Sequence, residues 1–157
     1  MKTTNVLNSS ILSVCCSAKS YSQDFSQLKD AQFNWKTDYS DAENKVLECA
    51  NYLMSTPLDG TNLNREYAEH FLFLWVSGTP DFTFNICKTA SKIIRSNLSL
   101  LSIYFACAAK FVLENRDKLK DGNGICKNAI SLLLDYCKNP ENNVDQSEIL
   151  ENLLISA

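Results

Sequence analysis

One stretch decides the fold of this chain: LSLLSIYFACAAKFVL, from Leu98 to Leu113. Its apolar side chains cover nearly every face of a helix, and such a helix must be covered by neighbours on several sides. Ser99, Ser102 and Lys110 interrupt it, and its 16 residues fall short of the roughly 20 that a bilayer requires. We therefore expect no membrane span, and we expect this helix to be the buried axis of a bundle.

Helical periodicity continues on both sides of this stretch. A capping box from Ser40 to Glu43 predicts the first helix start. Asn64 is the expected N-cap of the second helix, and Thr79-Pro80 is the expected start of the third. The expected helices run from residue 40 to just before Pro57, and then over 65–77, 80–95, 97–115, 125–138 and 145–155.

No segment shows the pattern of a hairpin or a parallel strand, so the sequence predicts an all-α fold. We expect a compact bundle of five to six helices around the central helix at 98–113. An irregular helical-hairpin array of the tetratricopeptide kind is the alternative. Pro57, Pro80 and Pro140 end similar segments, but their spacings of 23 and 60 residues do not match a regular 34-residue unit.

The 157 residues fit one domain, which we place at 40–157, preceded by an extended arm over 23–39 whose aromatic side chains dock on the core. The chain has 15 basic and 18 acidic side chains, a net charge of -3, without charge blocks. A nucleic-acid binder needs a basic face, so this charge pattern argues against nucleic acid as a partner.

The first 22 residues have the outline of a signal peptide. Lys2 precedes a short apolar stretch, Ile11–Ala18, and Ser20-Tyr21-Ser22 places small residues before Gln23. We expect cleavage before Gln23 and a periplasmic or secreted protein. A frayed tail on a cytoplasmic protein is the alternative.

The single histidine, His70, lies one helical turn after Glu66. This spacing is typical of an ordinary surface pair, and it also resembles the way a catalytic base is oriented. A hydrolase or thiol enzyme that uses His70 with a nearby cysteine or carboxylate is therefore the alternative function. One histidine excludes multi-histidine metal sites, and we expect no metal and no cofactor.

Seven cysteines are present, and two of them, Cys15 and Cys16, belong to the presumed leader. The other five never approach a C-x-x-C spacing, which argues against a zinc cluster or a thioredoxin-type pair. Cys126 and Cys137 are about 16 Å apart along one helix and cannot bond to each other. We expect buried thiols, with one disulfide as the alternative; the five are Cys49, Cys87, Cys107, Cys126 and Cys137.

The segment Gly78-Thr-Pro-Asp-Phe-Thr-Phe84 places two aromatic rings beside a rigid helix entry. Such rings often anchor a partner, so Pro80, Phe82 and Phe84 are the candidate binding residues for an unknown protein or small ligand. In the alternative interpretation, Phe82 and Phe84 close the core. No catalytic motif stands out, so we expect a non-catalytic domain with a binding or structural role.

Four segments of the chain carry a resemblance to a known group of proteins: DYSDAENKVL at 38–47, GTPDFTF at 78–84, KFVLEN at 110–115 and DYCKNP at 135–140. In these pieces the chain resembles a group of small, mostly helical proteins of Bacteroidota whose function is unknown and which usually carry a signal peptide. The resemblance covers about 23–143. It implies export with cleavage before Gln23, and it transfers no functional residues.

Overall fold

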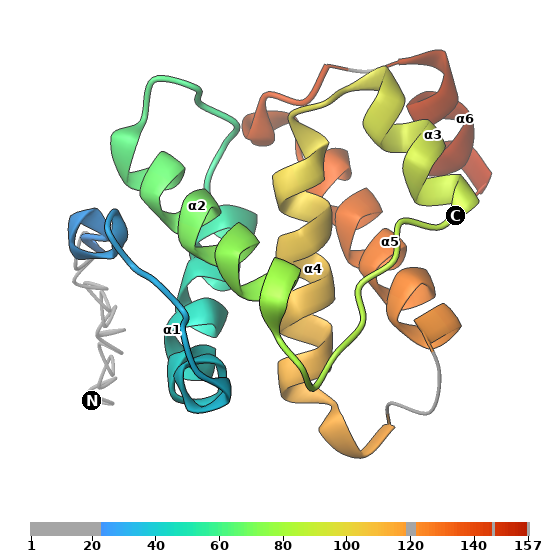
Figure 1. Cartoon of the computed structure of the whole chain (residues 1–157). Helices are drawn as coiled ribbons and strands as arrows, with labels where there is room; N and C mark the ends of the chain where they lie inside the picture. The colour runs from blue at the N-terminus through green and yellow to red at the C-terminus, as the bar shows by residue number, and fades with distance from the viewer. Residues whose placement is uncertain (1–22, 119–121, 146, 157) are drawn as a thin grey trace, which may run out of the picture.

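The computed structural model describes residues 23–118, 122–145 and 147–156, and within these ranges it is all helical, with no strand. This confirms the all-α, compact bundle, while the predicted leader at 1–22 lies outside the described residues. The α-helices are α1 (Lys36–Ser55), α2 (Leu63–Gly78), α3 (Lys88–Ser96), α4 (Leu100–Glu114), α5 (Gly122–Lys138) and α6 (Glu148–Ser156), and 3-10 turns lie at Ser26–Leu28, Arg116–Lys118 and Pro140–Asn142 (Figure 1).

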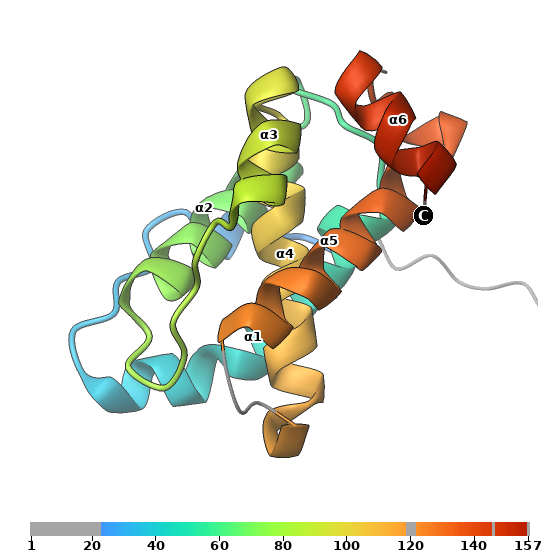
Figure 2. The same ribbon diagram turned by 90° about the vertical axis from the view of Figure 1, so that its right-hand side faces the viewer.

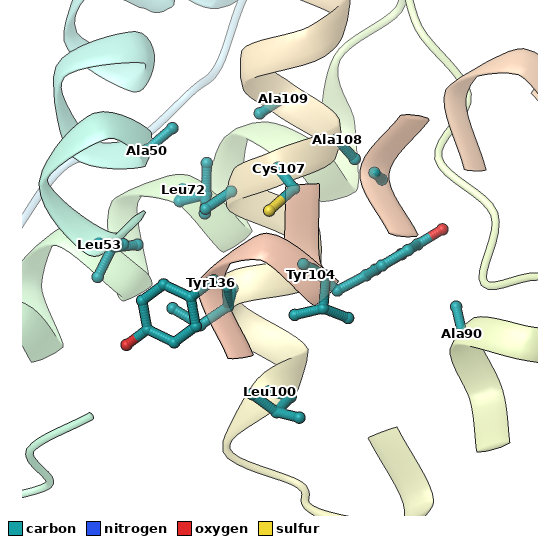
Figure 3. Packing of buried hydrophobic residues seen from close by; sticks show 14 of the residues in the cluster. Ala50, Leu53, Leu72, Ala90, Leu100, Tyr104, Cys107, Ala108, Ala109 and Tyr136 are labelled. Atoms are coloured by element: carbon teal, nitrogen blue, oxygen red, sulfur yellow. The ribbon is translucent and has the colours of Figure 1, made fainter. Parts of the chain in front are cut away.

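Helix α4 is the buried axis, as expected. It packs against α1, α2 and α5, with α3 at its N-terminal end (Figure 1). The small residues of α4 lie beside α1, α2 and α5, where they allow close packing (Figure 3). Its buried residues are Leu100, Ser102, Ile103, Tyr104, Ala106, Cys107, Ala108, Ala109 and Val112.

The repeat-array alternative does not describe this packing. α1 contacts α4 across two intervening helices, and α6 returns to pack on α3 and α5. Figure 2 shows α6 beyond the C-terminal end of α5. Units of a repeat array contact only their neighbours in sequence. The helices therefore share one core.

The central helix begins later than predicted. The side chain of Asn97 accepts a hydrogen bond from the amide of Ser99 at 3.1 Å, and its carbonyl accepts from the amide of Leu100 at 3.1 Å. Asparagine forms such turns in competition with helix, so α4 begins at Leu100. Leu98, predicted to be core, is instead 74% exposed.

The first helix begins earlier than predicted, and the proposed capping box at Ser40 is wrong. The carboxylate of Asp38 accepts from the amides of Asn34 at 2.7 Å and Trp35 at 2.9 Å, which holds the entry to α1. Ser40 lies inside the first turns, and its hydroxyl donates to the carbonyl of Thr37. The arm therefore ends at residue 35 rather than 39.

The arm docks on the core through Phe25, which is 1% exposed and meets the ring of Tyr52 edge-on at 5.1 Å. Asn64 explains how the arm is held, because its side chain accepts from the amide of Phe25 at 2.6 Å. Asn64 is therefore not the N-cap of α2. That role belongs to Asn62, which accepts from the amide of Arg65 at 3.1 Å.

The predicted third helix over 80–95 is wrong in its first half, because residues 79–87 are not helical and α3 begins at Lys88. The rings of Phe82 and Phe84 both lie against Trp75, at 5.9 and 5.8 Å between centroids. An extended chain places residues i and i+2 on one side, so both rings reach Trp75 without a helix. Burial of the two rings outweighs the helix-start signal of Pro80.

A disulfide joins Cys87, at the start of α3, to Cys126 in α5. The expectation that these two cysteines are buried thiols is therefore wrong, because the non-helical 79–87 segment brings Cys87 within reach of α5. Cys49, Cys107 and Cys137 keep buried thiols, as predicted.

The ends of the last two helices also differ from expectation. α5 begins at Gly122, three residues before the predicted start at 125, so the glycines at 122 and 124 lie in its first turn. α6 begins at Glu148, three residues after the predicted start. Helices α1 and α5 each end two residues before a proline, as predicted.

Candidate functional site

The predicted binding segment at 80–84 packs on the molecule itself. Phe82 and Phe84 contact Trp75, and the guanidinium of Arg116 lies over the Phe82 ring at 5.3 Å from its centroid. Pro80 is exposed. These contacts give Phe82 and Phe84 the core-closing role of the alternative interpretation, and a binding role for Pro80, Phe82 and Phe84 stays a prediction.

A hollow of about 310 Å³ lies elsewhere, where three segments meet. Its lining comes from the loop between α1 and α2, from the first turns of α2, and from residues 98–102 at the start of α4. This volume is at the lower end of the range for ligand pockets. The residues lining this α2–α4 hollow are Leu58, Asp59, Gly60, Asn62, Arg65, Glu66, Glu69, Phe73, Leu98, Ser99, Leu101 and Ser102.

Arg65 joins two of the segments that line the hollow, α2 and the loop that follows α1. It is 3% exposed, and its Nη1 donates to the hydroxyl of Thr56 and the carbonyl of Pro57, each at 3.0 Å, with the carbonyls of Leu53 and Thr56 slightly further away. These carbonyls belong to the end of α1, where a helix leaves its last acceptors without partners. The buried guanidinium therefore clamps the C-terminus of α1 onto α2.

Glu69 carries the clamp on to α4. One of its oxygens, Oε1, accepts from Arg65 Nε at 3.1 Å and from the Ser102 hydroxyl at 2.9 Å. A buried charge costs free energy unless it is paired and hydrogen-bonded, and Glu69 supplies the pairing charge. Arg65 Nη2 remains buried without a hydrogen-bond acceptor in the described part of the chain.

Two more carboxylates line the hollow. The hydroxyl and the amide of Thr61 donate to Asp59 at 2.7 and 2.9 Å, and these bonds hold the pKa of Asp59 below its ordinary value. Glu66 is exposed, and its carboxylate makes no hydrogen bond or ion pair with another described side chain. The hollow thus holds three carboxylates against one guanidinium.

His70 lies beside this hollow but not in it. It is exposed, and it lines a second, more open depression of about 410 Å³ on the outer face of α2, together with Lys29, Glu66, Tyr67, Glu69 and Phe73. The two depressions share Glu66, Glu69 and Phe73, so they form one continuous surface along α2.

The thiols are not placed for catalysis with His70. Cys49 and Cys107 are fully buried, and burial raises the pKa of Cys49 to about 12 and that of Cys137 to about 11. The nucleophilic form of cysteine is the thiolate, and a raised pKa suppresses it at neutral pH. The geometry supports packing roles for these three side chains.

The described residues contain neither a metal-binding cluster nor a helix that could cross a membrane. No group of three or more histidine, cysteine or acidic side chains is arranged to hold a metal ion. None of the described helices combines the length and the apolarity needed to cross a bilayer.

Sequence reasoning missed the α2–α4 hollow. The sequence analysis considered Glu66 only as a partner for His70, and it assigned Leu98 to the core. Nothing in the local pattern shows that Arg65 is buried, since arginine at the start of an amphipathic helix usually faces solvent. The one signal was Ser99 and Ser102, polar side chains at the start of an otherwise apolar helix.

The chain was compared with protein-family models, with curated proteins and with solved structures, and none of the three comparisons found a match.

Proposed function

We propose that this chain is a non-catalytic, exported helical domain that binds a partner through the α2–α4 hollow. The carrying observation is the clamp around Arg65, which joins α1, α2 and α4 and so shapes the hollow in advance. Binding to a preformed surface avoids the entropic cost of ordering it.

The exposed apolar side chain at the rim of the hollow supports a binding role. Leu98 is 74% exposed next to the buried start of α4. Leu98 shares the lining of the hollow with Phe73, Leu101 and several polar side chains, and an apolar lining with a few polar groups is typical of a binding site.

The Cys87–Cys126 disulfide supports export. Disulfides form and persist in oxidising compartments such as the bacterial periplasm, and they are rare in the cytosol. Together with the leader-like outline of residues 1–22, and with the resemblance to exported Bacteroidota proteins, it favours a periplasmic or secreted domain.

The binding role is tested by capture from native envelope extract with the wild-type chain and two variants. Leu98→Asn removes the apolar side chain at the hollow, and Ile155→Asn makes the same change at an 86% exposed residue of α6. We expect Leu98→Asn to lose the captured protein and Ile155→Asn to retain it. Equal capture by both variants, or no capture by the wild type, contradicts the proposal.

Export is tested by the N-terminus of the protein purified from its native cells. We expect the mature chain to begin at Gln23. An intact Met1 on the native protein contradicts export.

A further inference from the structure

We infer that the α2–α4 hollow receives a single cationic side chain, lysine or arginine, from a protein partner. This inference rests on the proposed function, because it names the chemistry of the partner at the same site.

The charges of the hollow favour a positively charged occupant. The guanidinium of Arg65 pairs with Glu69 and donates to carbonyls near the end of α1, and only its Nη2 lacks an acceptor in the described part of the chain. Three carboxylates, Asp59, Glu66 and Glu69, line the hollow with one guanidinium, so its acidic side chains outnumber its basic ones by two. A partner with a positive charge meets complementary potential here, whereas an anionic partner is repelled.

The apolar part of the lining favours an occupant with a long apolar stem. Phe73, Leu98 and Leu101 lie in the same hollow as the carboxylates. Lysine and arginine have long apolar stems that cover apolar surface while the charged head stays at a polar rim. Phe73 belongs to the same lining, and an aromatic ring attracts a cation placed over its face.

The size of the hollow favours a single side chain as its occupant. A volume of about 310 Å³, at the lower end of the range for ligand pockets, suits one extended side chain or a small ligand. A bare metal ion is not the occupant, because the described carboxylates do not converge on one point. A side chain that is apolar along its stem and charged at its tip matches a lining that contains both Leu98 and Glu66.

The test uses the isotope-labelled full chain and four blocked tripeptides, acetyl-Gly-X-Gly-amide with X as lysine, arginine, norleucine or glutamate. Backbone amide shifts of residues 58–62, 66–73 and 98–102 report occupancy at millimolar peptide. We expect the lysine and arginine peptides to shift these amides, and the norleucine and glutamate peptides to leave them unchanged. Raising the salt concentration should weaken the effect, because exposed charges are screened.

Two charge-neutralising variants sharpen the test. Glu66→Gln should weaken binding of the lysine peptide about threefold, the size expected for one exposed ion pair. Glu151→Gln makes the same chemical change on the exposed face of α6, away from the hollow, and should leave the affinity unchanged.

Each other outcome overturns the inference. If norleucine binds as well as lysine at the same amides, the hollow is an apolar site, and the proposed binding function still stands on the Leu98→Asn and Ile155→Asn comparison. Unchanged affinity in Glu66→Gln, or no shift with either cationic peptide, rules out recognition of a cationic side chain.

Discussion

Removal of the Cys87–Cys126 bridge should destabilise the folded chain by several kcal/mol. The two cysteines are 39 residues apart, and between them the chain includes α3 and α4. In the chain-entropy treatment, opening a loop of about 40 residues returns about 13 cal/mol/K to the unfolded state, or about 4 kcal/mol at 25 °C. This is a large part of the 5–15 kcal/mol that is typical of a domain.

The variant to measure is Cys87→Ala/Cys126→Ala, which leaves no unpaired thiol in place of the bridge. At about 2–4 °C per kcal/mol for a chain of this size, we expect the midpoint of thermal unfolding to fall by about 8–16 °C. A reducing agent should lower the midpoint of the wild type toward that of the variant and leave the variant unchanged, which serves as the internal control.

The folded state of the variant should survive this loss. The hydroxyl of Tyr104 still donates to the carbonyl of Asn85 at 2.6 Å, and the aromatic contacts on Trp75 still hold the segment before α3. Peptide mapping of the wild type without reduction should find the two cysteines linked. If the wild type is linked and the free energy of unfolding of the variant is lower by less than about 1 kcal/mol, the loop-entropy reasoning is refuted.

Two further predictions concern glycine packing and thiol ionisation. Gly78→Ala should lower the free energy of unfolding by about 1–2 kcal/mol, because a Cβ there would lie 2.0 Å from the Tyr39 hydroxyl, whereas Gly60→Ala meets no atom within 4 Å and should be neutral or slightly stabilising. Urea unfolding measures both, and equal effects would contradict the packing. Burial raises the pKa of Cys49 from 9.0 to about 12, so between these values its thiol ionises only in the unfolded chain. From pH 7 to pH 10 the wild type should therefore lose about 1 kcal/mol more stability than Cys49→Ala, and parallel pH curves would contradict this.

The helices that sequence reasoning located well are those with a single dominant signal. α4 is apolar on nearly every face, so it has to be central wherever its neighbours come from. α5 and α1 end next to prolines, whose effect on the backbone is local. Such features depend on the residue itself and its near neighbours along the chain, and they survive folding unchanged.

The errors arose where two local signals competed, or where a distant residue decided the outcome. Pro80 predicts a helix start, but burial of Phe82 and Phe84 on Trp75 outweighs that preference. Asn64 is a good N-cap in isolation, yet it serves the arm at Phe25, 39 residues away. The candidate site could not be predicted at all, because its walls come from three segments that only packing brings together.

The sequence by itself therefore determined the all-α class, the central position of α4 and the burial of Cys49, Cys107 and Cys137, because hydrophobic periodicity acts through local geometry. Only the tertiary structure decided the Cys87–Cys126 pairing, the burial of Arg65 and the hollow between α2 and α4. The physical reason is that each of these depends on distances between segments remote in sequence. Those distances are set by how the helices pack together, and no single segment encodes them.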